Sequence, residues 1–239
     1  MKIDYTPKTL RLSGKGLTEL PDLSKYTKLK KLFCRNNNLT HVDNLPHWIE
    51  ILICASNKLV ALDNLPPGLL ELDCSYNKIV ALENLPPGLK ILKCAGNKIK
   101  SLDYLPHTLT HLNCSENDIS QINNLPSGLQ VLSCTDNHLT SLNNLPPGLT
   151  QLKCWYNQIT KFSYLPPGLV DLMCFNNRIT SFDYLPPGLV YFFCCNNQIT
   201  NLDYLPPSVL EFKCNNNPLS YDFEPTLENI KNYNASRSA

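Results

Sequence analysis

The chain has 239 residues, of which 43% are hydrophobic and 17% charged, and its formal net charge at pH 7 is +1. This charge is too close to zero for a general binder of nucleic acid or anionic membranes, and the hydrophobic content is too high for a disordered chain. The sequence has no run of 18 apolar residues that would predict a transmembrane helix, and its first residues lack the apolar stretch of a secretory signal. We therefore expect a cytoplasmic protein whose 11 cysteines are reduced thiols.

A period of 20 residues dominates the sequence. Cysteine recurs at 34, 54, 74, 94, 114, 134, 154, 174, 194 and 214, and asparagine recurs three positions after each of these cysteines. A single coil of 20 residues cannot bury its own apolar edge, whereas stacked coils share one continuous core. The period therefore predicts a stack of coils with a parallel sheet that receives one strand from each coil.

The first unit is irregular. Leu10 precedes its counterpart Leu32 by 22 residues, and the segment between them lacks the Pro-Pro-Gly sequence of later units. Terminal repeats of a solenoid are usually atypical because an open end exposes the core and the strand edges. We expect residues 1–24 to form an N-terminal capping repeat and residues 25–220 to form the solenoid.

Each regular unit predicts a short strand followed by a narrow return. Residues 89–102 read L-x-x-L-x-C-x-x-N-x-I-x-x-L, and the alternation of Leu92 and Cys94 is typical of a strand with one buried face. The Leu-Pro-Pro-Gly-Leu segment, as in residues 65–69, favours an extended or turn backbone because proline is excluded from helix interiors. We expect Gly68 to supply a turn conformation that a side chain would resist.

The period stops after Leu219. Pro225 and Thr226 then precede apolar residues at Leu227, Ile230 and Tyr233, a spacing that indicates a short amphipathic helix. We expect residues 221–239 to contain a helix that covers the last coil, with a frayed tail over 234–239.

The repeat resembles the leucine-rich repeat, with cysteine at a position that usually holds Leu, Val or Ile. The short period and the Leu-Pro-Pro-Gly-Leu return are most similar to the 20-residue repeats of bacterial effector proteins, and also to repeat proteins of amoeba-infecting giant viruses. The resemblance covers residues 10–220. It implies a mostly β fold of the α/β solenoid class, right-handed, with a parallel sheet on the concave face and short extended or turn segments on the convex face.

Two rows of residues are expected to point into the stack. An Asn amide at the end of each strand can bond backbone groups of its own loop and of the neighbouring coil. The cysteines face the same side as Leu92, where a thiol packs as a small hydrophobe. Disulfides are disfavoured because in-register strands aim their Cβ atoms side by side, and a linear row offers no tetrahedral metal site. We expect no metal and no cofactor.

The outward positions of the sheet form the natural binding face of a solenoid. In the middle coils these positions are polar and include Ser115. In the C-terminal coils they carry a cluster that we call the aromatic patch: Trp155, Tyr156, Met173, Phe175, Tyr191, Phe193 and Cys195. Exposed aromatic clusters usually mark interaction sites, so we assign the patch to protein binding. The alternative is that the rings only pack on one another across strands.

Other variable positions give weaker signals. Lys58, Lys78 and Lys98 form a basic row that acidic residues follow five positions later in each coil, which indicates a solvated edge. Tyrosines form a row at the convex side: Tyr104, Tyr164, Tyr184 and Tyr204. An acidic and histidine group, which is the chemistry of a metal-dependent enzyme, lies at coil edges: Glu116, Asp118, Asp136 and His138. We keep this enzyme as a remote alternative and assign no catalytic residue.

The sequence therefore predicts a non-enzymatic scaffold for protein–protein interaction. Its partner would be a protein or peptide on the concave face, with no nucleic acid and no membrane, and the scaffold itself would be a monomer. The main alternative is a pathogen-encoded protein, a bacterial effector or a viral protein, that acts on host proteins in the host cytoplasm.

Overall fold

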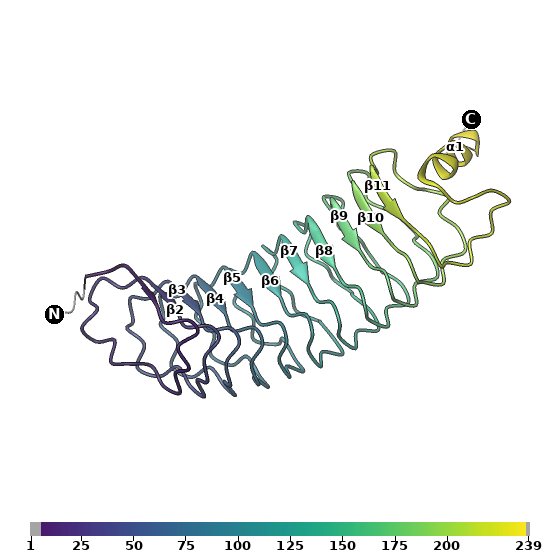
Figure 1. Ribbon diagram of the computed structural model, residues 1–239. Coiled ribbons are helices and arrows are strands. Elements are labelled where there is room, and N and C mark those ends of the chain that lie inside the picture. The colour runs from purple at the N-terminus through teal and green to yellow at the C-terminus, as the bar shows by residue number, and fades with distance from the viewer. Residues whose placement is uncertain (1–5, 238–239) are drawn as a thin grey trace. The chain divides into compact units, whose positions relative to one another are not determined.

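The computed structural model describes residues 6–237, and Figure 1 draws its strands and its helix. The chain forms two compact units that divide after Ile119. The first unit contains β1 (Thr9–Arg11), β2 (Lys31–Phe33), β3 (Ile51–Ile53), β4 (Glu71–Asp73), β5 (Ile91–Lys93) and β6 (His111–Asn113). The second unit contains β7 (Val131–Ser133), β8 (Gln151–Lys153), β9 (Asp171–Met173), β10 (Tyr191–Phe193), β11 (Glu211–Lys213) and α1 (Leu227–Arg237).

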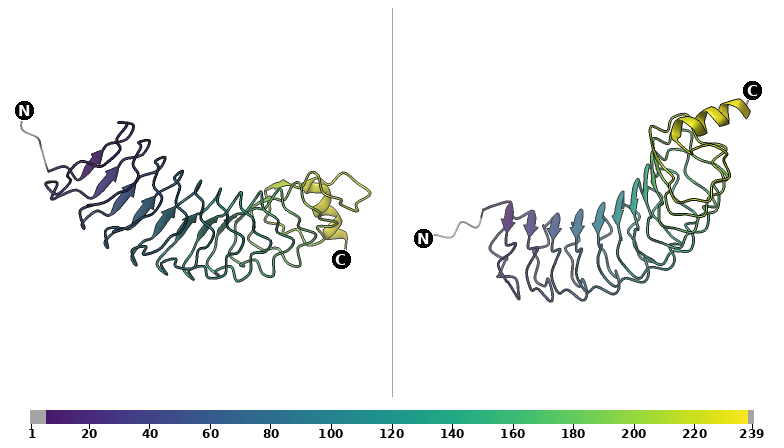
Figure 2. Two further views of the ribbon diagram at one scale, coloured as in Figure 1. Left: turned by 90° about the horizontal axis from the view of Figure 1, so that it is seen from below. Right: turned by 45° about the vertical axis from the view of Figure 1, so that its right-hand side comes forward.

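Within each unit the strands pair in parallel and in chain order. Equivalent residues of successive coils lie side by side, as Leu92 and Leu112 do in the first unit and Leu152 and Leu172 in the second. Leu10 pairs with Leu32, so β1 keeps this register despite the longer spacing of the first repeat. The short arrows of successive N-terminal coils make this repetition visible in Figure 2. The predicted solenoid with a parallel sheet is thus confirmed.

The interior of the internal coils is apolar and buried, whereas Leu10 of β1 and Phe212 of β11 are half-buried at the two ends. In the coil that contains β5, the side chains of Leu89, Leu92, Cys94 and Ile99 all have 0% exposure. In the second unit Phe192 and Phe212 stand at the position of Leu92. The ring of Phe182 packs edge-on against Phe192 at a centroid distance of 5.2 Å. Apolar burial at every coil is the main favourable term that holds the stack together.

The asparagines make the predicted backbone bonds in both units. Asn57 Nδ2 donates to the carbonyl oxygens of Cys34 at 3.0 Å and Cys54 at 2.9 Å, and Asn57 Oδ1 accepts from Leu39 N–H at 3.0 Å. Asn177 repeats the pattern in the second unit, where its Oδ1 accepts from Ile159 N–H at 2.9 Å. Each amide therefore ties its own loop to the preceding coil, which satisfies backbone groups that water does not reach.

The cysteine row is buried and reduced. All 11 cysteines are free, and only Cys195 lies outside the buried row. Burial raises the pKa of the Cys34 thiol and of the Cys114 thiol to about 12, so these groups stay protonated at neutral pH. The Cys94 thiol donates to the carbonyl oxygen of Asn113 at 3.4 Å. The row therefore behaves as small apolar side chains, as predicted.

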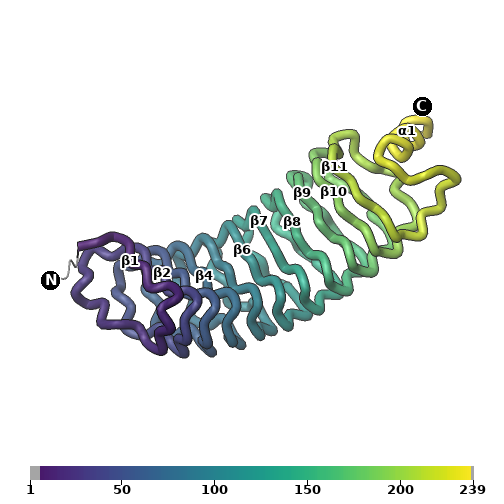
Figure 3. Tube along the Cα trace, viewed as in Figure 1, coloured from purple at the N-terminus to yellow at the C-terminus, as the bar shows by residue number. Residues whose placement is uncertain are grey.

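The return segments turn at Pro-Pro-Gly, but for a different reason than expected. Leu69 N–H donates to Pro66 O at 3.1 Å, which closes the turn, and the returns follow one another along the tube in Figure 3. Gly68 is not in the left-handed region, so the expectation that it needs special backbone freedom is wrong. Thr108 and Ser208 occupy the equivalent position, where Thr108 Oγ1 donates to Pro87 O at 2.7 Å. The same turn closes at Thr108, where Leu109 N–H donates to Pro106 O at 3.1 Å, so it does not require glycine.

A left-handed residue follows β2 to β11 instead, two positions after the cysteine of each coil. This position holds Gly96 at φ +64°, but it also holds Tyr76 at φ 56° and Tyr156 at φ 52°. Left-handed φ is costly for tyrosine. The coils on both sides over-determine the conformation, since Tyr76 N–H donates to Ala95 O at 2.6 Å.

Helix α1 lies beside the last coil in Figure 2 and covers it. The Thr226 hydroxyl caps the helix by accepting from Asn229 N–H at 3.2 Å. Ile230, within the helix, is fully buried. The expectation of a frayed tail is wrong for residues 234–237, which remain helical. Asn234 Nδ2 donates to Leu202 O at 3.0 Å, which fastens this turn to the solenoid.

The predicted caps lie partly beyond what the structure describes. Residues 1–5 and 238–239 of the two predicted caps lie outside the described residues, and the boundaries 1–24, 25–220 and 221–239 stay predictions. No helix within residues 6–237 is long and apolar enough to cross a membrane.

Candidate functional site

The aromatic patch lies on the outward side of the sheet in the second unit. Trp155 follows β8 and Phe175 follows β9, and their rings stack with centroids 5.0 Å apart and an interplanar angle of 8°. The ring of Tyr156 meets Phe175 edge-on, with centroids 6.1 Å apart. The coils therefore bring these three rings together, as expected for either role of the patch.

The rest of the patch lies on β9 and β10. Met173 and Phe193 are register partners, and the ammonium of Lys213 lies 5.5 Å from the centre of the Phe193 ring. Tyr191 is 39% exposed and Tyr156 56% exposed, whereas the other patch residues are half-buried. Apolar atoms of neighbouring coils therefore face water over a continuous part of this surface.

The position directly after the buried cysteine distinguishes the coils of Trp155 and Phe175 from the five coils that precede them. It holds a small residue in the coils of Ala55, Ser75, Ala95, Ser115 and Thr135, each at most 9% exposed. The expectation that Ser115 presents itself to solvent is therefore wrong, because a small side chain there is covered by its neighbours. Trp155 and Phe175 are too large to be covered in this way and stand out from the sheet.

A carboxylate that the sequence analysis did not single out lies within the same surface. Asp171 begins β9 next to Gln151 and Tyr191, its register partners on the two neighbouring strands. It is only 8% exposed, and its Oδ2 accepts from Gln151 Nε2 at 2.6 Å. Burial raises the pKa of Asp171, while the bond from Gln151 and the positive charge of Lys153 oppose that rise.

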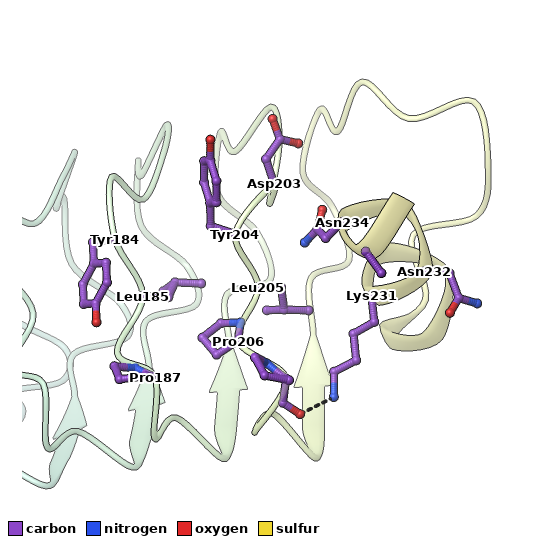
Figure 4. Close-up of a pocket in the computed structure, with 12 residues that line it drawn as sticks. Tyr184, Leu185, Pro187, Asp203, Tyr204, Leu205, Pro206, Lys231, Asn232 and Asn234 are labelled. Carbon is purple, nitrogen blue, oxygen red and sulfur yellow. Dashed lines mark hydrogen bonds between the residues drawn. The ribbon is translucent and has the colours of Figure 1, made fainter. Parts of the chain in front are cut away.

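A separate pocket lies between the convex tyrosines and helix α1 (Figure 4). It has a volume of about 580 Å³, and the rings of Tyr184 and Tyr204 flank it. Lys231 Nζ donates to Pro207 O at 2.8 Å, and the carboxylate of Asp203 pairs with Arg237 at 3.3 Å. Its charged groups are thus engaged within the protein, and its walls are mainly apolar.

The basic row keeps its predicted character. Lys58, Lys78 and Lys98 are all exposed, and so are the acidic residues that follow them, Asp63, Glu83 and Asp103. Both charges therefore lie on a solvated edge of the first unit.

The geometry gives little support to the remote alternative of a metal-dependent enzyme. Glu116 accepts from Tyr76 OH at 3.1 Å, and this bond raises the pKa of Tyr76. Glu116 and Asp118 belong to the first unit, whereas Asp136 and His138 belong to the second. Within residues 6–237, no group of three or more His, Cys, Asp or Glu side chains is arranged to hold a metal ion.

Known structures share this architecture. YopM from Yersinia enterocolitica WA-314 is 31% identical with a TM-score of 0.80, over 87% of this chain and 51% of that protein. The functional domain of InlJ from Listeria monocytogenes, which includes a cysteine ladder, is also 31% identical with a TM-score of 0.80, over 89% of this chain and 49% of that one. The chain thus spans about half the length of these two structures.

A third comparison covers both chains more evenly. The leucine-rich repeat domain of a Shigella effector is 30% identical with a TM-score of 0.51, over 74% of this chain and 70% of that chain. No protein-family model and no curated protein sequence matches the chain. The expected similarity to giant-virus proteins stays a prediction. The repeat, the strand register and these structural matches agree, and the chain belongs to the leucine-rich repeat proteins.

Proposed function

We propose that the chain is a scaffold for protein–protein interaction that binds a protein or peptide on the outward side of its sheet, with the aromatic patch as anchor. The observation that carries this proposal is the Trp155–Phe175 stack, which occupies a position that the coils of β3 to β7 fill with small buried residues. Aromatic side chains supply much of the binding energy in protein interfaces. Outward sheet faces are also the usual binding surfaces of solenoids.

The test is truncation of both rings. Trp155→Ala combined with Phe175→Ala is expected to abolish partner capture in a pulldown, while the melting temperature changes little. The loss in stability should be about 0.5–1.5 kcal/mol, the typical contribution of an aromatic pair beyond its burial. The rings lie outside the coil interior, so the buried leucine, cysteine and asparagine rows remain intact.

A matched control removes two rings from another surface of the same unit. Tyr184→Ala combined with Tyr204→Ala changes the flank of the pocket beside α1 and should leave partner capture unchanged. If the control pair abolishes capture and the patch pair does not, the binding surface is the convex side and the proposal is wrong.

A second candidate function is favoured by the comparisons. YopM and the Shigella domain are similar to this chain, and the latter belongs to an effector. On this proposal the chain is a pathogen-encoded protein that acts on proteins in the cytoplasm of a host. Its 11 free thiols fit a reducing compartment. Identification of the captured partner as a host protein supports this candidate, and capture only from the source organism contradicts it.

We also propose a monomeric, non-enzymatic chain with neither nucleic acid nor membrane among its partners. The net charge of +1 supports weak attraction to polyanions. Light scattering after size exclusion measures the mass directly, and a dimer mass would contradict the monomer.

A further inference from the structure

A buried carboxylate lies beside the aromatic patch, on the strand between β8 and β10. The first residues of β8, β9 and β10 are Gln151, Asp171 and Tyr191, which lie side by side in register. Aspartate is the shortest side chain of the three and is only 8% exposed, whereas Tyr191 is 39% exposed. Asp171 is therefore flanked by longer side chains on both neighbouring strands, and its carboxylate is mostly shielded from water.

One oxygen of this carboxylate lacks a partner. Oδ2 accepts from Gln151 Nε2 at 2.6 Å, but Oδ1 is buried and receives no hydrogen bond from any group in the described part of the chain. An ionised carboxylate has room for about four donors, and a buried acceptor without a donor costs about 1–3 kcal/mol. Asp171 is therefore a buried acceptor that the chain itself leaves unsatisfied.

Neither of the two nearby lysines hydrogen-bonds Oδ1 of Asp171. Lys153 attracts the carboxylate through space from β8, but it does not hydrogen-bond Oδ1. The ammonium of Lys213 lies instead over the ring of Phe193 at 5.5 Å. The surface thus combines exposed rings with a recessed negative charge, which complements an apolar segment that carries a cationic side chain.

We propose that Asp171 selects the partner: a bound peptide segment lays apolar side chains on the Trp155–Phe175 stack and presents a lysine or arginine whose N–H donates to Asp171 Oδ1. This inference rests on the proposed function of the patch. On this proposal the side chains around Asp171 rotate to admit the donor, and such rotations are common at interfaces. Hydrogen bonds to charged groups are stronger than neutral ones, so the pair adds both affinity and specificity.

The experiment selects random dodecapeptides displayed on phage against the immobilised chain. The wild-type protein should enrich peptides in which lysine or arginine is flanked by apolar residues. Asp171→Asn keeps the shape of the side chain and its bond from Gln151, and should enrich apolar peptides without a basic residue. Asp183→Asn removes an exposed carboxylate from a return segment and serves as the charge-matched control, which should select as the wild type does.

An enriched arginine peptide then gives a direct measurement. Replacement of its arginine by citrulline, which is neutral and nearly isosteric, should weaken binding to the wild type by roughly ten- to a hundredfold, as expected for a hydrogen bond to a charged group. The same replacement should change the affinity for the Asp171→Asn variant by less than about threefold.

The outcomes separate the two proposals. Enriched peptides without basic residues, or an equal effect of citrulline on both proteins, overturn the role of Asp171 but leave the patch as a binding surface. If the wild type enriches no peptide above background, or if Trp155→Ala with Phe175→Ala leaves enrichment unchanged, the proposed function of the patch fails as well.

Discussion

Removal of one interior asparagine tests how the coils are held together. Asn117 is 6% exposed in the first unit, and its Oδ1 accepts from Ile99 N–H at 3.0 Å. Its Nδ2 donates to the carbonyl oxygens of Cys94 at 3.0 Å, Cys114 at 3.1 Å and Ser115 at 2.9 Å. Asn117→Ala removes all four contacts while leaving the apolar core in place.

The hydrogen bonds that remain in Asn117→Ala determine how much stability the variant loses. The Cys94 oxygen still accepts from Asn97 Nδ2 at 3.0 Å, and the Ser115 oxygen still accepts from Gly96 N–H at 3.0 Å. Ile99 N–H, however, loses its acceptor inside the coil. One buried donor without a partner costs about 1–3 kcal/mol, and the weakened carbonyl bonds place the expected loss in the upper part of that range.

Urea denaturation measures this loss. With a slope of about 2 kcal/mol per molar urea, a loss of about 2 kcal/mol lowers the midpoint by about 1 M. Asn123→Ala removes an exposed amide and should leave the midpoint within the error of the wild type. An equal urea midpoint for Asn117→Ala and the wild type would refute the reasoning. Water would then be able to replace every hydrogen bond that the Asn117 amide makes.

Three further expectations follow from burial and backbone geometry. Titration with a thiol reagent in the native state should modify Cys195 rapidly and the other ten of the 11 cysteines only after denaturation; fewer than eleven groups without reductant would indicate disulfides. Gly96→Ala should cost about 1–2 kcal/mol, since φ is +64° and an added Cβ would lie 2.4 Å from the ring of Tyr76, whereas Gly148→Ala should be nearly neutral; equal melting temperatures contradict this. Because burial raises the pKa of Asp171, its ionised form opposes folding above that pKa. Asp171→Asn should therefore be more stable than the wild type at pH 7, and this difference in stability should shrink as the pH falls toward about 4. A stability difference that grows on acidification would contradict the predicted direction.

The repeated positions could be predicted from the sequence because each has one physical task in every coil. Leu92, Cys94 and Asn97 recur at fixed spacing, and burial and backbone satisfaction leave few other places for them. The strand register follows from the same spacing, since a shift of one residue would turn the leucines to solvent. The fold and the orientation of both rows were therefore accessible before the structure.

The missed features depend on neighbouring coils. A pattern within one coil marks Asp171 as an outward charged residue, whereas its burial and its bond from Gln151 depend on the neighbouring coils. The sequence analysis also missed the left-handed position. Glycine at Gly96 indicates a left-handed residue, but tyrosine at the equivalent Tyr156 does not. Residue identity is a weak signal where hydrogen bonds from both sides impose the conformation.

Two departures from the repeat meet in the coils of β8, β9 and β10, and both are unfavourable in the free chain. The Trp155–Phe175 stack keeps apolar surface in contact with water at a position where small residues are compatible with the coil. Asp171 buries an acceptor that no group in the described residues satisfies. A partner with apolar side chains and one cation relieves both at once, because it covers the rings and donates to the carboxylate. If the two features are one recognition surface, Asp171→Asn and the ring truncations should show a coupling free energy in a double-mutant cycle of peptide binding, and strictly additive effects would separate them.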